Sequence, residues 1–524
     1  MTELLLDGNN LKVEDIHAFI KDKRATVRIA AKALLAVEKS KKFLDEEIYK
    51  KIIYGVNTGF GPMASHIISS SHLQELQKNL ILSHAVGMGE PIKEEYVTSA
   101  MIVRLNALIK GYSGVTVELV KHLQQFINNR IIPVVPEHGA VGTSGDLTQL
   151  AHVALALIGE GEVMYGGQRK KAKDVMKKLN IAPYTLQPKE GLALINGTSI
   201  MAGIGAVICN DMKRILSIAL RTGALSLELV HGIDDSLTPL LHQIRPHKGQ
   251  KDVATVMRKL LLQSHVLKKR QMLQKEILPN NTKSDVKEVK ETIQQVYSFR
   301  CIPQILGPVL SAYWRTSKDI NIEINSVTDN PIIDWKNKRF LHGGNFHGDF
   351  VSLSLDCLKM TIVKLMMLSE RRVNFFLNHK INGQFPPFLN LGKPGLTLGL
   401  QGLQFVATST TAHSQTLAFP QYVHSIPTNG DNQDVVSMGT DAALIAARVV
   451  ENAYIVLAIE LITLAQGVDF LHIENKLSTA GQMLFRKVRR VFPKLTYDRA
   501  IDRTLPQVLN FIKADESFMV KDLL

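Results

Sequence analysis

The segment MAGIGAVICNDMKRILSIALRTGALSLELV, residues 201–230, is apolar around most of its circumference when it is drawn as a helix. Two further segments, 351–378 and 440–468, have the same character, and all three lack proline. At about 1.5 Å per residue, helices of this length extend about 40 Å. Because such helices need apolar partners on several sides, the sequence predicts a long-helix bundle whose core is completed by other subunits.

Segments rich in proline and glycine, 382–395 and 419–434, are predicted to be loops between the long helices. We find no internal repeat and no low-complexity linker. The simplest division is therefore a mixed N-terminal domain over residues 1–199 and a central and C-terminal helical bundle over residues 200–524.

Composition places the chain among globular proteins: 45% of its 524 residues are hydrophobic and 21% are charged. The longest apolar run, 453–468, contains Glu460 and is too short for a membrane span. The first twenty residues lack a basic flank followed by an apolar core, so a signal or transit peptide is not indicated. We therefore expect a cytoplasmic protein that does not contact membranes.

The three cysteines, Cys209, Cys301 and Cys357, form no CxxC pair and lie far from clustered histidines, so neither disulfides nor a metal site is expected. The formal charge of +14 raises the possibility of a nucleic-acid partner. However, the basic clusters at 166–178 and 265–271 have no interleaved aromatic residues and match no groove-reading motif. We interpret them as solvated helix faces, with a phosphate-rich partner as the alternative.

The segment EHGAVGTSGDLTQLAHVAL, residues 137–155, concentrates flexible backbone directly before an apolar helical pattern. A turn needs only one glycine to reach positive φ, so several glycines suggest that the backbone must approach itself closely. A serine hydrolase is a weak interpretation, because Asp146 replaces the second glycine of GxSxG. The seven positions 139–145 contain three glycines and a Thr-Ser pair: Gly139, Gly142, Thr143, Ser144 and Gly145.

Five other stretches contain polar residues of the kinds found in active sites. Individually they have ordinary explanations, since a tyrosine in a turn usually packs and Asn-Gly is a common turn pair. Together they provide a phenol, an arginine and several amides, without a metal-binding set, a phosphate-binding GxxxxGK loop or a Ser-His-Asp spacing. They are YGVNTGFG (54–61), GLALINGTS (191–199), YSFRCIPQ (297–304), HGGNFHGD (342–349) and DNQDVVSMG (431–439).

These motifs, together with GTSGDL, resemble those of the aromatic amino acid ammonia-lyases and 2,3-aminomutases, which include the histidine, phenylalanine and tyrosine ammonia-lyases. The resemblance keeps the same order over nearly the whole chain. It implies a mainly α, long-helix bundle of the ammonia-lyase/fumarase-like superfamily and a homotetramer whose active sites each draw on three chains. The alternative without catalysis is a basic helical scaffold that binds anionic partners.

The resemblance also implies a cofactor made from the chain itself, 4-methylidene-imidazole-5-one (MIO), with no external cofactor. In this chain the nitrogen of Gly145 would attack the carbonyl of Thr143, and Ser144 would lose water to supply the methylidene. The usual tripeptide of the family is Ala-Ser-Gly, so Thr143 is a departure. Because the ring uses only the backbone of that residue, we expect the chemistry to persist.

Roles for individual residues follow from the resemblance. Tyr54 would be the base that removes the β-proton, and Arg300 would bind the substrate carboxylate through two hydrogen bonds. Asn196 and Tyr297 would orient the amine, the carboxylate and the electrophile. The remaining residues expected around ring and substrate are Gly61, Ser83, His84, Asn432 and Gln433.

Two positions bear on the substrate and disagree. Ser83 and His84 resemble the pair found in histidine ammonia-lyases, but those enzymes carry a glutamate where this chain has the neutral Gln433. Loss of a charged partner for an imidazole should matter more than one pocket-lining pair. The chain also resembles a subgroup of bacterial tyrosine ammonia-lyases that keeps the Ser-His pair, and this resemblance implies that the His84 imidazole bonds to the substrate phenol. We therefore expect L-tyrosine to give trans-4-coumarate. The alternatives are a urocanate-forming histidine ammonia-lyase, an aromatic 2,3-aminomutase, and a His84 that packs against Tyr54 without touching substrate.

Overall fold

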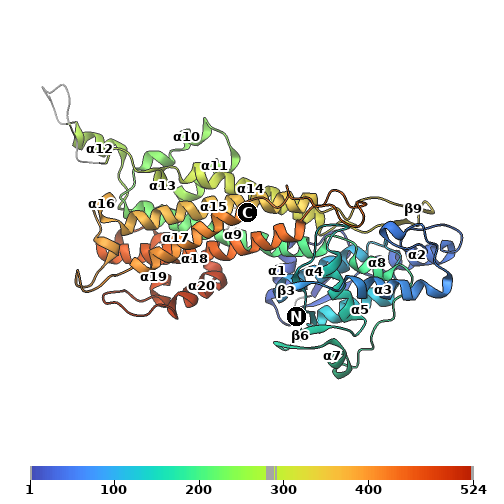
Figure 1. The fold of residues 1–524 in the computed structure, drawn as a ribbon. Coiled ribbons are helices and arrows are strands. Elements are labelled where there is room, and N and C mark those ends of the chain that lie inside the picture. Colours follow the sequence, from blue (N-terminus) through green and yellow to red (C-terminus); the bar gives the residue numbers. More distant parts are fainter. Residues whose placement is uncertain (1–2, 279–287, 289–291, 521–524) are drawn as a thin grey trace. The chain divides into compact units, whose positions relative to one another are not determined.

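The computed structural model describes residues 3–278, 288 and 292–520, which form two compact units (Figure 1). Each unit combines three separate stretches of the chain. The first unit comprises Met1–Asn210, Arg315–Cys357 and Pro420–Ala447, and the second comprises Asp211–Trp314, Leu358–Phe419 and Arg448–Leu524.

The first unit combines helices with small sheets. Strand β1 pairs with β2 in parallel. The other pairs are antiparallel, and they are β3 with β5, β4 with β6, β6 with β7, and β8 with β9. The strands are β1 (Glu3–Leu6), β2 (Thr26–Ile29), β3 (Met88–Pro91), β4 (Ile132–Pro133), β5 (Pro136–His138), β6 (Glu162–Tyr165), β7 (Gln168–Lys171), β8 (Ile332–Asp334) and β9 (Arg339–Leu341). The helices are α1 (Val13–Lys21), α2 (Ala31–Glu47), α3 (Leu73–His84), α4 (Glu94–Leu108), α5 (Val117–Asn128), α6 (Leu147–Leu157), α7 (Ala172–Lys178) and α8 (Glu190–Ile195).

Helix α4 is the central helix of the first unit, because every residue from Tyr96 to Leu108 is buried. A helix that is covered all round must lie inside the core rather than on its surface. Helices α1 and α5 contact it, and α3, α6 and α8 contact one another. The last three helices carry or adjoin the loops of the candidate site, so the site is built on packed helices.

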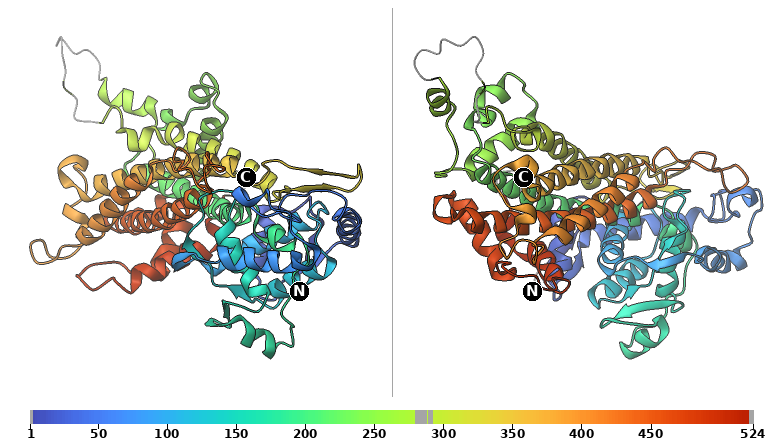
Figure 2. Two further views of the ribbon diagram at one scale, coloured as in Figure 1. Left: turned by 45° about the vertical axis from the view of Figure 1, so that its right-hand side comes forward. Right: turned by 60° about the vertical axis from the view of Figure 1, so that its left-hand side comes forward.

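The predicted long helices are confirmed, with α9 at Ser199–Leu229, α15 at Asp349–Leu377 and α18 at Gly439–Leu471. They run side by side with α14 (Ile302–Glu323) and α17 (Gln401–Leu417) in the views of Figures 1 and 2. The mainly α fold is therefore confirmed. The second unit also contains α10 (Pro239–Gln243), α11 (Lys248–Leu260), α12 (Arg270–Ile277), α13 (Tyr297–Arg300), α16 (His379–Asn382), α19 (Thr479–Val491) and α20 (Thr504–Ala514).

Helix α18 is long and apolar enough to cross a bilayer by length and composition alone. However, 72% of its most apolar window is buried within the protein. Burial of this extent is expected of the central helix of a bundle, and it explains the apolar run noted in the sequence.

A buried ion pair joins the long helices inside the second unit. Glu460 of α18 accepts hydrogen bonds from the Arg372 guanidinium and, at 2.6 Å, from the Ser369 hydroxyl, both on α15. Both charged side chains are almost completely inaccessible to water. Since a buried charge is costly unless it is paired and hydrogen-bonded, this contact fixes the register of α15 against α18.

Replacement of Arg372 by methionine should lower the free energy of unfolding by about 3–5 kcal/mol, because it leaves Glu460 buried without its charged partner. Arg486→Met is the matched control, since Arg486 and its ion-pair partner Glu474 are 56% and 38% exposed and the pair should contribute about 1 kcal/mol or less. Thermal unfolding of the two variants, followed by circular dichroism beside the wild type, provides the measurement. Equal losses of Tm would contradict a special role for the buried pair.

Candidate active site

The Thr-Ser pair of the glycine-rich segment forms the tip of a tight turn between Gly142 and Gly145, which pair with each other. The φ angles of Gly142, Ser144 and Gly145 are +80°, +55° and +81°. A Cβ on Gly145 would lie 2.2 Å from the carbonyl oxygen of Gly197, so only glycine fits there. The close backbone approach expected from the sequence is therefore present.

Asp146, directly after the turn, fixes it to two of the long helices. Its buried carboxylate accepts hydrogen bonds from the backbone N–H groups of Ile200, at 2.7 Å, and Met201, at 3.1 Å, in the first turn of α9. It also accepts one from the hydroxyl of Thr440 on α18. A helix N-terminus has unpaired N–H groups and a positive partial charge, so a carboxylate is the suitable partner.

Helix α8 and the residues after it form the second wall of the turn. The N–H of Gly197 donates to the Ser144 carbonyl at 3.1 Å, and the Gly197 carbonyl accepts from the N–H of Asp146 at 2.8 Å. The buried Arg104 donates to the carbonyl of Asn196 at 2.8 Å. The Asn196 side chain therefore starts from a backbone that is fixed at both neighbouring peptides.

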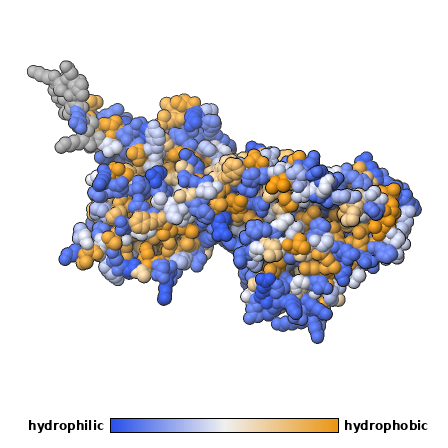
Figure 3. All heavy atoms as spheres, in the orientation of Figure 1, coloured by the Kyte–Doolittle hydropathy of each residue, from blue (hydrophilic) through white to orange (hydrophobic). Residues whose placement is uncertain are grey.

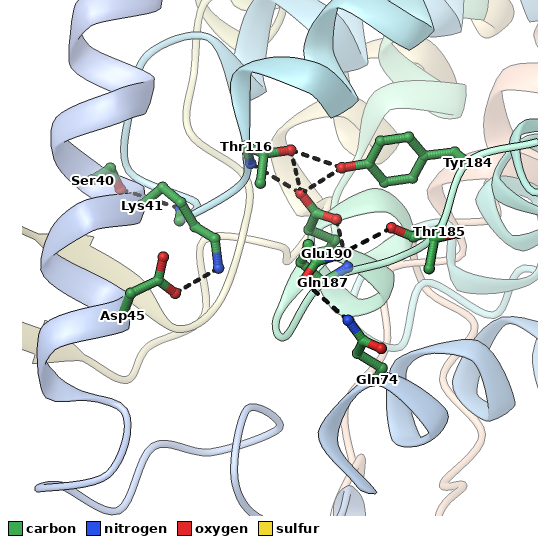
Figure 4. Close-up of polar contacts among 10 residues, drawn as sticks. Ser40, Lys41, Asp45, Gln74, Thr116, Tyr184, Thr185, Gln187 and Glu190 are labelled. Carbon is green, nitrogen blue, oxygen red and sulfur yellow. Dashed lines mark hydrogen bonds and ion pairs between the residues drawn. The ribbon is translucent and has the colours of Figure 1, made fainter. Parts of the chain in front are cut away.

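Buried charges fix the N-terminal end of α8. Lys189 forms a 2.7 Å ion pair with Asp329, and both side chains are almost completely buried. The carboxylate of Glu190 accepts hydrogen bonds from Thr116 and from the Tyr184 hydroxyl, as Figure 4 shows. These contacts prevent α8 from shifting along its axis.

The Tyr54 loop is anchored by apolar packing of the residues that flank Tyr54. Its neighbours Ile53 and Val56 belong to a buried hydrophobic cluster that also includes residues of α2, α3 and β8. The Tyr54 hydroxyl oxygen accepts a hydrogen bond from the N–H of Gly61 at 3.0 Å. The phenol is thus directed by a backbone donor of its own loop.

The end of α3 determines the tautomer of His84. Its Nδ1 lies 2.9 Å from the carbonyl oxygen of Leu80 and 2.9 Å from the hydroxyl of Ser83. A carbonyl can only accept, so a neutral imidazole in this position carries its proton on Nδ1. The other ring nitrogen, Nε2, is then a hydrogen-bond acceptor.

These elements surround a cavity of about 520 Å³ in the first unit, which is a suitable size for an amino acid. Gln433 lines it and donates to the Ser144 hydroxyl at 3.4 Å. The side-chain oxygen of Asn196 is buried and lacks a hydrogen-bond partner among the described residues, which leaves it available to a ligand. Nine of the twelve residues given roles in the site from the sequence line this cavity: Tyr54, Gly61, Ser83, His84, Thr143, Ser144, Gly145, Asn196 and Gln433.

Three singled-out residues do not line the cavity. Asn432 is exposed, one residue before Gln433. Tyr297 and Arg300 belong to α13 in the second unit, where the guanidinium lies 4.5 Å from the centre of the Tyr297 ring. The Arg300 Nε is buried and has no hydrogen-bond partner within the described part of the chain.

The cavity also contains residues that sequence reasoning did not select. Asn79 and Leu80 line it from α3, one turn before Ser83, Met63 lines it from a short 3-10 helix (Gly61–Met63), and Thr428 and Asn429 line it from a loop. The helical spacing of Asn79 and Leu80 relative to Ser83 was a usable signal, because residues three and four apart share a face. Within the described ranges, histidine, cysteine and acidic residues form no group suited to a metal ion.

Comparison with known proteins agrees with this geometry. The family model for aromatic amino acid lyases matches residues 11–490. A histidine ammonia-lyase from Geobacillus thermodenitrificans is 38% identical over 511 residues, which are 97% of each chain. Among solved structures, a tyrosine aminomutase from Streptomyces globisporus has a TM-score of 0.93 at 36% identity, over 98% of this chain and 97% of that one. The histidine ammonia-lyase from Trypanosoma cruzi has a TM-score of 0.88 at 30% identity, with coverages of 100% and 96%.

The chain therefore belongs to the aromatic amino acid lyase family. The predictions of an enzyme, of this family and of its fold are confirmed, and the alternative of a scaffold without catalysis is not supported. The relatives and structural neighbours include both ammonia-lyases and aminomutases, so the family alone does not define the product.

The buried carboxyl of Asp146 should make stability depend on pH. Burial raises its pKa from 3.8 to about 6, against the opposing effect of the hydrogen bonds from Thr440, Met201 and Ile200. Between these values the folded chain retains a proton that the unfolded chain has lost. The free energy of unfolding should therefore fall by up to about 3 kcal/mol as the pH rises through this window, and the loss should persist at higher pH.

The measurement is chemical unfolding at several pH values across that window. Asp146→Asn should remove this part of the pH dependence, whereas Asp174→Asn, at an exposed position of α7, should retain it. A wild-type profile that Asp146→Asn leaves unchanged would contradict the assignment.

Proposed function

We propose that this protein eliminates ammonia from L-tyrosine to give trans-4-coumarate, with MIO formed from Thr143, Ser144 and Gly145. The turn fits this group. Its third residue lacks a Cβ where a side chain would strike the Gly197 carbonyl, and positive φ angles at Ser144 and Gly145 give the bend that a five-membered ring requires. The chemistry that MIO supplies is electrophilic, and it makes the substrate amine a better leaving group.

Tyr54 would be the base that accepts the β-proton. Tyr54 lines the same cavity as the turn, and its hydroxyl oxygen already accepts a hydrogen bond from the Gly61 N–H. A fixed backbone donor stabilises the negative charge on a phenolate, which is the form that can accept a proton. The unpaired side-chain oxygen of Asn196 would accept a hydrogen bond from the substrate amino group.

Arg300 and Tyr297 would bind the substrate carboxylate from another subunit of a homotetramer. Arg300 has a buried donor without a partner among the described residues, as expected of a group arranged to receive an anion. Exposed apolar side chains support assembly, because large apolar surfaces are usually covered by a partner. In the second unit these include Leu240, Leu241 and Ile244 at α10 and Phe405 on α17. Figure 3 shows a hydrophobic patch in the region of α10. The cytoplasmic location, a role for Asn432 and the domain division at residue 199 stay predictions.

The observation that carries the choice of tyrosine over histidine is the neutral Gln433 in the cavity, and the tautomer inferred for His84 supports it. With the proton on Nδ1, its Nε2 can accept a hydrogen bond from a phenol hydroxyl. Gln433 contributes a neutral amide to the cavity rather than a carboxylate. A cavity without that carboxylate offers less to an imidazole that becomes cationic.

Histidine is the second candidate, because the relatives at 37–38% identity are histidine ammonia-lyases. A substrate imidazole N–H could also donate to Nε2 of His84. A 2,3-aminomutase is the third, because a solved tyrosine aminomutase shares the fold at a TM-score of 0.93. Analysis of the products distinguishes all three, since they are coumarate, urocanate and a β-amino acid.

Intact-mass measurement of the purified chain tests the cofactor. Ring closure removes two water molecules, so the wild type should be lighter than its sequence by that amount. Ser144→Ala cannot form the methylidene and should lack activity. A wild-type mass that equals the sequence mass would overturn the assignment of MIO.

Assays with tyrosine, histidine and phenylalanine test the substrate. The wild type should prefer tyrosine, and His84→Leu should reduce the preference for tyrosine over phenylalanine about 10- to 100-fold, because the phenol loses its acceptor. Ser83→Ala is the matched control and should change the preference much less. Predominant formation of urocanate by the wild type would replace tyrosine with histidine.

A further inference from the structure

We propose that Gln77 is a positioning residue that sets the place of Tyr54 relative to Asn196 and His84. The inference rests on the proposed function, because it concerns the step in which Tyr54 removes a proton. Gln77 lies in the middle of α3 and is completely buried. It does not line the cavity, so it would act through the residues that do.

The amide of Gln77 connects three structural elements. Its Nε2 donates to the carbonyl oxygen of Gly55 at 3.1 Å, in the residue directly after Tyr54. Its Oε1 accepts from the N–H of Leu192 at 3.0 Å, in the first turn of α8. Helix α3 ends at His84, and α8 leads directly into Asn196. The Gln77 side chain therefore joins the Tyr54 loop to the helices that carry His84 and precede Asn196.

The hydrogen bond from the Leu192 N–H to Gln77 cannot be replaced by one within α8. Leu192 is in the first turn of α8, where an N–H has no acceptor within its own helix. The elements are also too close for another side chain to enter. A Cβ on Gly191 would lie 2.4 Å from the backbone oxygen of Gln77, and one on Gly55 would lie 2.7 Å from the Leu192 side chain.

The other contacts of the Tyr54 loop fix it to different elements. Asn57 bonds to the carbonyls of Ile48 and Lys51, at the end of α2, and the Gly55 N–H donates to Thr58 within the loop. Among the described residues, the hydrogen bonds of Gln77 are the ones that join this loop to α3 and α8. Without them, the loop would still be held by its hydrogen bonds near the end of α2, by the bond from the Tyr54 N–H to His342 and by apolar packing, but none of these hydrogen bonds joins it to α3 or α8.

This arrangement predicts a specific kinetic defect. A displacement of about 1 Å at a reacting group can cost about 100-fold in rate. Because the hydrogen bonds of Gln77 go to the Tyr54 loop and to α8, and not to the groups proposed to bind the carboxylate, its loss should slow proton removal more than it weakens substrate binding. The turn is fixed by Asp146 and Gly197, so ring closure should not require Gln77.

The experiment compares Gln77→Met, which keeps the length of the side chain but loses both hydrogen bonds, with Gln74→Met. Gln74 is the matched control, since it lies one turn earlier on α3 and is exposed, with its amide bonded to the side chain of Gln187 (Figure 4). The measurements are kcat, KM, the intact mass and the kinetic isotope effect for the preferred amino acid deuterated at its β-carbon.

For Gln77→Met we expect a fall in kcat of about 10- to 100-fold, a change in KM within about threefold, a larger isotope effect and an unchanged loss of two waters. Gln74→Met should resemble the wild type. Gln77→Glu provides a second test, because only its protonated carboxyl can both donate a hydrogen bond to the Gly55 carbonyl and accept one from the Leu192 N–H. Its activity relative to the wild type should therefore be higher in the acidic part of the active range than in the alkaline part.

Three results would overturn the proposal. The first is an unchanged kcat and isotope effect in Gln77→Met. The second is a loss of kcat in Gln77→Met that is explained by failure to lose the two waters. The third applies if Gln77→Met does not fold, and it is an activity of Gln77→Glu, relative to the wild type, that does not vary with pH. A wild type that loses no water, or releases no ammonia, would overturn the proposed function itself. The mass of the wild type therefore distinguishes the two failures.

Discussion

The fold and the candidate site both depend on one buried carboxylate, that of Asp146. It satisfies N–H groups at the start of α9, accepts the hydroxyl of Thr440 on α18 and follows directly after the tight turn. These donors offset part of the cost of removing the carboxylate from water, and the part that remains raises its pKa. The position of the turn, and with it the tripeptide proposed to form MIO, is therefore set by the ends of two of the long helices.

The sequence predicted the elements whose signals are local. Three long helices were recognised because their apolar residues cover most of the surface and no proline interrupts them. Helix α14 was not expected, because Pro303 and Pro308 interrupt the pattern that identifies a helix, although Pro303 lies in its first turn and Pro308 is accommodated inside it. The glycines of the turn were also a local signal. Positive φ angles favour glycine, and Gly142 and Gly145 both have them.

The supports of the site could not be predicted, because they join residues that are far apart in the chain. Lys189 pairs with Asp329, and Gln77 contacts both Gly55 and Leu192, but nothing near these residues in the sequence indicates the partner. The chemistry of a known residue can also depend on such a contact. The acceptor role proposed for His84 rests on the Leu80 carbonyl, which is a backbone group that every residue possesses.

The discontinuous composition of the first unit has a consequence for how the protein matures. Thr440 follows Asp146 by 294 positions, and Gln433 follows Ser144 by 289. At roughly 5–20 residues per second, a ribosome needs about 15–60 s to synthesise the chain between them. During that interval the tripeptide has left the ribosome, but the walls of its turn do not yet exist. A ring that closes only in the finished turn would thus serve as a chemical record that synthesis had passed residue 440, and chains that terminate earlier would retain an unreacted tripeptide.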